Sequence, residues 1–176
     1  MEKTHWQRAM ETCTAAQREI TLLGRSTEDV VPLVKQALAR GDPNVFLLIP
    51  GVEAWRPGFT LQLADDLLDR ALSDRYALQV CRILGGLPHA DLERVIGPLV
   101  VKRLRDADGP YADLDFRRYA EVLRFLGLSA DLRDLIDRAR ASTKLEVRNV
   151  GEEFSRKLDG GERPFASRLS SPTPRI

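Results

Sequence analysis

The stretch "LQVCRILGGL" occupies residues 78–87, and "AEVLRFLGLS" occupies residues 120–129. With Leu78 set against Ala120, valine, arginine, leucine and glycine recur at the same places, at an offset of 42 residues. A second offset, of 31 residues, sets the segment from Phe116 to Leu123 against the segment from Val147 to Phe154. Periods of this size are typical of repeated helical hairpins.

The composition is that of a folded protein. Of 176 residues, 43% are hydrophobic and 30% charged, and the formal net charge is +1. This balance excludes a fully disordered chain, and it gives no global attraction to nucleic acid or to an anionic membrane. Because no apolar run resembles a signal peptide or approaches the ~20 residues of a membrane span, we expect a cytoplasmic protein without membrane contact.

Apolar side chains recur at helical spacing along most of the chain. They predict helices over about 5–22, 60–72, 74–86 and 90–105, with further helical stripes at 30–38, 116–126, 132–139 and 147–158. Gly24 is expected to end the first helix, and Pro50-Gly51 to open a loop over residues 50–60. We therefore predict an all-α fold of antiparallel helical hairpins.

The domain organisation follows from this pattern. Residues 1–50 would hold N-terminal helices that form a divergent cap, and residues 51–60 a Pro/Gly loop. Residues 61–158 would hold the repeats, and residues 159–176 a disordered tail. On the first helix, Trp6, Met10, Cys13 and Ile20 share an apolar stripe, so we expect Trp6 in the core. Cys13 and Cys81 are both expected to be buried free thiols.

The segment "LGLSADLRDLIDRARASTKLEVRNVGEEFSRKL", residues 126–158, is similar to a HEAT repeat, in which a helix, a turn and a second helix with a Val-Arg pair form a hairpin. Here the pair is Val147-Arg148, and Pro98 matches the proline that often kinks a first helix in this family. The resemblance covers about residues 60–158. It implies a right-handed α-solenoid with a concave face lined by the second helices. In this family an aspartate is expected four residues before the arginine of each second helix, and here it is present only as Asp113, before Arg117. Armadillo-like folds and unrelated helical bundles stay open as alternatives.

The two offsets also align charged positions that share a face of each second helix. The aligned sets are Arg75, Arg117 and Arg148; Gln79, Glu121 and Glu152; and Arg82, Arg124 and Ser155. We call the first eight of these positions the Arg/Glu ladder. It is either a binding wall for phosphate or carboxylate groups, or a lattice of ion pairs that joins neighbouring repeats. Trp55, in the Pro/Gly loop, is a further candidate anchor for a partner.

Catalysis has little support in the sequence. The two histidines, His5 and His89, lie far apart, and His89 is best explained as a residue at the start of a helix. Two His and two Cys without close spacing do not make an ordinary zinc site, and no nucleotide-binding or nucleophile motif occurs, so we predict no metal and no cofactor. The acidic side chains near Asp65 and Asp69 indicate a solvated helix face.

The predicted function is a non-catalytic protein–protein interaction module, an adaptor or scaffold that binds another protein on its concave face. The alternative is a nucleic-acid-binding HEAT-like protein, related to DNA repair or glycosylase-type proteins, that would use the arginines of the ladder. A helical enzyme such as a lyase is the third hypothesis, and no residue can be given a role in it.

Overall fold

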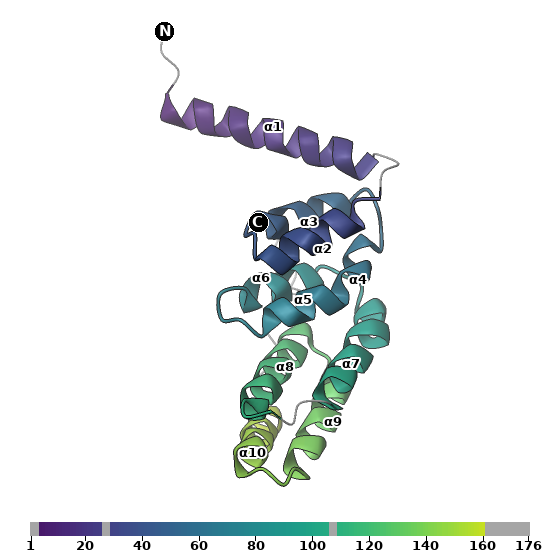
Figure 1. The fold of residues 1–176 in the computed structure, drawn as a ribbon, viewed down its shortest axis with the longest axis vertical. Helices are drawn as coiled ribbons and strands as arrows, with labels where there is room; N and C mark the ends of the chain where they lie inside the picture. Colours follow the sequence, from purple (N-terminus) through teal and green to yellow (C-terminus); the bar gives the residue numbers. More distant parts are fainter. Residues whose placement is uncertain (1–3, 26–28, 106–108, 161–176) are drawn as a thin grey trace, which may run out of the picture. The chain divides into compact units, whose positions relative to one another are not determined.

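A computed structural model describes residues 4–25, 29–105 and 109–160 of the chain, and these residues form helices and turns without any β-strand (Figure 1). The predicted all-α class is confirmed. The chain divides into two units, Met1–Asp66 and Leu67–Ile176. Most of the predicted tail, from residue 161 onward, lies outside the described residues.

The first unit holds α1 (His5–Arg25), α2 (Val31–Arg40), α3 (Val45–Glu53) and α4 (Phe59–Gln62). In this unit α3 contacts α1, α2 and α4. Thr4 caps α1, because its Oγ1 accepts a hydrogen bond from the Gln7 N–H at 3.3 Å. At the start of α2, the Val31 N–H donates to Asp29 Oδ1 at 3.1 Å. Gly41, with φ +72°, ends α2.

The expected break at Pro50-Gly51 is wrong, because α3 continues through both residues to Glu53. The side chains of Val45, Phe46, Ile49 and Val52 recur at helical spacing and are all buried. Their burial offsets the hydrogen bond that a proline removes inside a helix. Gly51 also has a packing role, because a Cβ atom there would overlap Cγ2 of Ile20 on α1.

Helix α1 differs from the prediction in two ways. It passes Gly24 and ends at Arg25. Its apolar stripe is not a core: Trp6 is 71% exposed, Met10 is 48% exposed and Cys13 is exposed. Ile20, which touches Gly51, is the member of the stripe that is half-buried. The apolar period identified the face of α1 that packs on α3 at Ile20, but no described residues cover most of the rest of that face.

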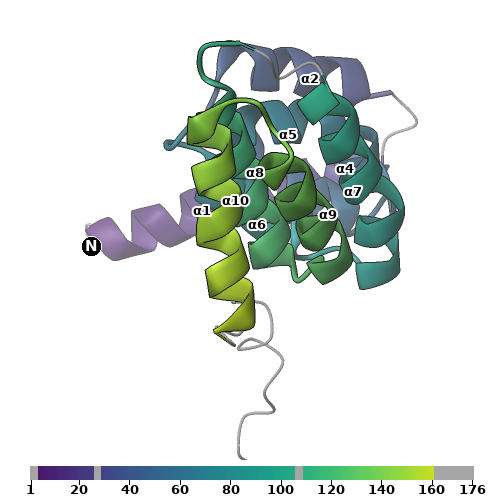
Figure 2. The ribbon, with the colours of Figure 1, turned by 90° about the horizontal axis from the view of Figure 1, so that it is seen from below.

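Helix α5 (Ala64–Ala71) crosses the boundary between the units, and the second unit continues with α6 (Ala77–Leu84), α7 (His89–Arg105), α8 (Ala112–Leu126), α9 (Ser129–Arg140) and α10 (Leu145–Asp159). Helix α8 contacts α6, α7, α9 and α10, while α7 contacts α9 and α9 packs along α10 (Figure 2). The predicted helix 90–105 corresponds to α7. This helix begins at His89, which was predicted to lie at the start of a helix.

Two glycines set the closest helix contacts of the second unit. Gly97 of α7 faces Asp131 of α9, whose carboxylate occupies the place of a Cβ atom. At Gly151 of α10, a Cβ would lie 3.1 Å from the Ala139 Cβ and from the backbone N of Arg140 on α9. Helix α7 also continues through Pro98, because Ile96, Val100 and Leu104 are buried on either side of it.

Candidate interaction surface

The Arg/Glu ladder lies in the second unit, on three consecutive neighbours, α6, α8 and α10, with Arg75 just before α6. Arg75 and the α6 residues Gln79 and Arg82 are exposed, as is Leu78 at 49%. The Arg75 guanidinium lies 5.2 Å from the ring centre of Tyr76, a cation–π contact. Within the described residues, no carboxylate pairs with Arg75 or Arg82.

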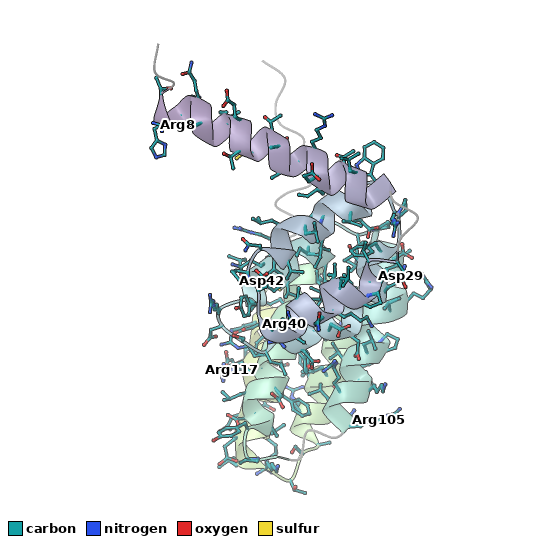
Figure 3. All side chains as sticks on the ribbon, turned by 45° about the horizontal axis from the view of Figure 1, so that its top comes forward. Arg8, Asp29, Arg40, Asp42, Arg105 and Arg117 are labelled. Carbon is teal, nitrogen blue, oxygen red and sulfur yellow. The ribbon has the colours of Figure 1, made fainter. Side chains whose placement is uncertain are left out.

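The α8 positions Arg117 and Glu121 both form ion pairs. Arg117, labelled in Figure 3, places Nη1 2.6 Å from Glu153 Oε2 and so joins α8 to α10. Hydrogen bonds from Lys157 and Arg117 hold the pKa of Glu153 below its usual value. Glu121 accepts from Arg118 Nη1 at 2.9 Å, and Arg118 also pairs with Asp74, which precedes α6. These contacts run from the segment before α6 through α8 to α10.

The α10 positions close the last hairpin. Arg148 Nη1 donates to the carbonyl oxygens of Ser142 and Thr143, both at 3.0 Å, and so holds the turn between α9 and α10. Glu152 accepts two hydrogen bonds from Arg140 of α9, at 3.0 and 3.3 Å. A planar guanidinium suits this two-point geometry better than a lysine would.

The structure therefore places the ladder on three neighbouring helices, but its residues have different roles. Arg117 and Glu152 join neighbouring helices, and Arg148 holds a turn. Glu121 pairs within α8, whereas the exposed residues at the start of α6 and on it face solvent. Sequence reasoning missed Glu153, Arg118 and Arg140 as the partners. The spacing of Arg118 to Glu121 and of Glu153 to Lys157 could have indicated the local pairs. The pairs between helices depend on packing and have no sequence signal.

Trp55 belongs to the first unit, in the turn between α3 and α4, and is 47% exposed. Glu53 holds this turn, because its two carboxylate oxygens accept the backbone N–H groups of Gly58 at 2.7 Å and Thr60 at 2.6 Å. Gly58 has φ +87°, which favours glycine at this position. The loop is thus shorter than expected and is fixed at both ends around Trp55.

The residues that the sequence raised as candidates for catalysis or metal binding have ordinary structural surroundings. His89 pairs with Glu93 at 3.3 Å on the exposed face of α7. Cys81 is buried as predicted, and burial raises the pKa of its thiol to about 12. Asp69, one of the acidic residues on α5, pairs with Arg103. Within the part of the chain that the structure describes, no three His, Cys, Asp or Glu side chains are grouped so that they could hold a metal ion, and no helix is long and apolar enough to cross a membrane.

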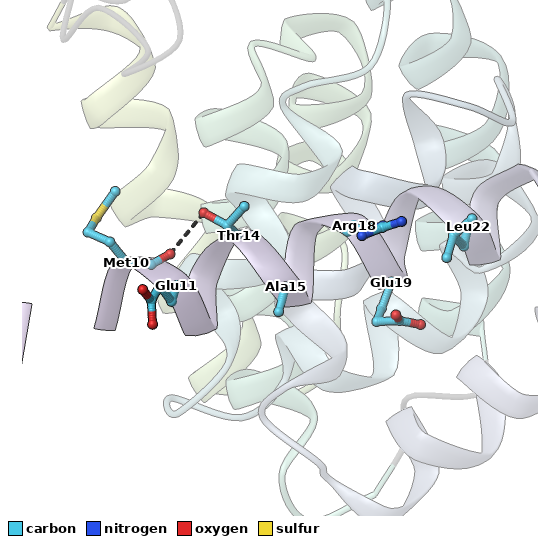
Figure 4. Close-up of a pocket in the computed structure, with 7 residues that line it drawn as sticks. All are labelled: Met10, Glu11, Thr14, Ala15, Arg18, Glu19 and Leu22. Atoms are coloured by element: carbon cyan, nitrogen blue, oxygen red, sulfur yellow. Dashed lines mark hydrogen bonds between the residues drawn. The ribbon is translucent and has the colours of Figure 1, made fainter. Parts of the chain in front are cut away.

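A hollow of about 600 Å³ lies along α1 (Figure 4). The described residues that line it all belong to α1: Met10, Glu11, Thr14, Ala15, Arg18, Glu19 and Leu22. Most of these residues lie on the side of α1 opposite to Ile20, as the helical spacing requires.

No protein-family model, curated protein or solved structure matches this chain.

Proposed function

We propose that the protein is a non-catalytic docking module that binds another protein through the face formed by α6, α8 and α10. In this proposal α5 to α10 are HEAT-like hairpins stacked into a right-handed solenoid, and these three helices line its concave side. The contacts of α8 with both α6 and α10 support this arrangement. A crystal structure of the full chain in which the three helices do not form one layer would contradict it.

The observation that carries the proposal is the exposed face of α6. Leu78 is 49% exposed and lies between Arg75 and Arg82 at helical spacing. No carboxylate among the described residues neutralises either arginine. An exposed apolar side chain flanked by two cations fits a partner that offers an apolar anchor with carboxylates beside it.

The ion pairs of α8 and α10 would support this face rather than bind the partner. Arg117 with Glu153, and Arg140 with Glu152, connect α8, α9 and α10. Exposed pairs of this kind contribute about 0–1 kcal/mol each, so their main effect is to fix helix positions. A docking face built on held helices loses less entropy when it binds.

The test is site-specific photocrosslinking in the native host, with a photoreactive amino acid placed at Leu78 or, as a control, at Arg133. Arg133 is exposed on α9. We expect a discrete crosslinked protein from position 78 that is lost when Arg82→Glu is added, and none from position 133. Equal crosslinking from both positions, or crosslinking to nucleic acid that weakens with salt, would contradict the proposal.

A further inference from the structure

The N-terminal half of α1 carries an apolar face that no described part of the first unit covers. From Thr4 to Glu19, every side chain whose exposure is described is exposed. The N-terminal turns of α1 project beyond α2 and α3 in Figure 1 and beyond α2 in Figure 2. The contact with α3 is made at the other end of the helix, where Ile20 meets Gly51. Trp6, at 71% exposure, is the largest apolar side chain of this face.

A partner that covers this face would stabilise the helix, because packing of an apolar face supplies most helix stability in proteins. In heptad terms, Trp6 and Cys13 take position a and Ala16 takes position d, so large and small side chains share one seam. A small residue leaves room for a large one from a facing helix.

We propose that residues 5–19 of α1 pair antiparallel with the same segment of a second copy of this chain. A two-fold axis near Glu11 sets Trp6 of each copy over Ala16 of the other. The same register sets His5 beside Glu19 of the other copy, on the flank of the seam. An isologous pair of this kind satisfies both ends of the interface at once.

Three features favour a second copy as the occupant. The seam is complementary to itself, because its bulky residue, Trp6, meets its small residue, Ala16. The His5 imidazole can donate a hydrogen bond to the Glu19 carboxylate at each end, so polar groups at the rim match. The charged residues Arg8, Glu11 and Arg18 lie outside the seam by helical spacing, so no like charges meet in it.

The paired segment is also continuous with the packing of α1 on α3. It ends just before Ile20, so the Ile20–Gly51 contact persists in the dimer. About four turns from each copy would bury an area near the lower limit of specific interfaces, about 1,200 Å². We therefore expect a dissociation constant in the micromolar range and a dimer that forms as concentration rises.

The first test is sedimentation velocity of the full chain from about 1 to 300 μM, a range that brackets a micromolar constant. Trp6→Glu should weaken the dimer at least ~30-fold, because each copy buries one aromatic anchor at Trp6 and the substitution removes both. Leu22→Glu is the matched control: Leu22 is 54% exposed on the same helix but lines the hollow away from the seam. A wild-type chain that stays monomeric throughout, or a dimer that responds equally to both variants, would overturn the proposal.

The second test checks the register without relying on Trp6. His5→Asp alone would set carboxylate against carboxylate, and Glu19→Lys alone would set cation against imidazole. In a mixed dimer of the two variants, position 5 of the first copy carries the introduced carboxylate and faces the introduced ammonium at position 19 of the second copy. At the other end, His5 of the second copy still faces Glu19 of the first. The mixture should therefore dimerise at least ~3-fold more tightly than either variant alone, the gain expected of one exposed ion pair. A mixture no tighter than its components would exclude this antiparallel register.

Discussion

Replacing Arg138 with alanine should destabilise the second unit by about 2 kcal/mol, because this side chain caps the end of α7 from α9. Its Nη1 donates to the Val101 carbonyl at 3.3 Å, and its Nη2 donates to the Leu104 carbonyl at 3.0 Å. The last four carbonyls of a helix have no partner inside the helix, and a cation near them is favoured by the helix dipole. A hydrogen bond from a charged group contributes about 1.5–3 kcal/mol.

Most of this loss of stability comes from the 3.0 Å hydrogen bond to Leu104, and the longer bond to Val101 contributes less, since Arg138 is only half-buried. Arg133→Ala is the matched control on the same helix, exposed and expected to change stability by no more than ~0.5 kcal/mol. Arg138→Lys should fall between the two, because it keeps the charge but loses the forked geometry.

The assay is denaturant unfolding combined with hydrogen exchange of peptides from α7, since two units need not unfold together. We expect Arg138→Ala to lower the unfolding free energy and to speed exchange in the last turn of α7. If Arg138→Ala and Arg133→Ala agree within ~0.5 kcal/mol and α7 exchange is unchanged, the capping argument is refuted.

Four further outcomes follow from the structure. In dilute protein, a thiol reagent should label exposed Cys13 and spare buried Cys81, whose pKa is raised to about 12, and intact mass should show one adduct until the chain unfolds. Gly151→Val should lower the unfolding free energy by about 2–3 kcal/mol in thermal melts, because a Cβ at position 151 of α10 would lie only 3.1 Å from atoms of α9. An unchanged unfolding free energy would mean that α9 and α10 can move apart at little cost. Glu53→Ala should speed exchange of the two amides that its carboxylate accepts, while Glu53→Gln, which keeps one acceptor, should do so less. Burial, with neighbouring carboxylates, raises the pKa of Asp131 above its usual value, so the folded state binds the Asp131 proton more tightly than the unfolded state does. The stability of the folded state should therefore fall as pH rises above about 4. Asp131→Asn should flatten this fall when unfolding is measured across pH, and an unchanged slope would count against the role of Asp131.

Sequence pattern predicted much of the helical framework, because the apolar period depends only on local geometry. The predicted range 90–105 matches α7, and the stripe from Phe116 matches α8. The burial of Cys81 followed from the same period. Helix α3 shows the limit of local rules, since burial of its apolar face overrides the breaking tendency of Pro50.

The candidate surface was predictable only in part. Spacing placed Arg82 and Arg117 on equivalent faces, but it could not distinguish an arginine that pairs with a distant carboxylate from one that faces solvent. Arg117 reaches Glu153 on another helix, 36 residues away in the chain. Such a pairing depends on how α8 and α10 pack, which no short stretch of sequence encodes.

The sequence by itself determined that the chain is helical, where most of its helices lie, and which face of each is apolar, because these properties repeat with the helical period. Only the tertiary structure decided which of those faces is covered. Trp6 and Val80 both belong to apolar stripes, yet Val80 is buried against neighbouring helices and Trp6 is 71% exposed. A period records the side on which a helix can pack, whereas burial also requires a second element within reach, and that depends on the whole chain.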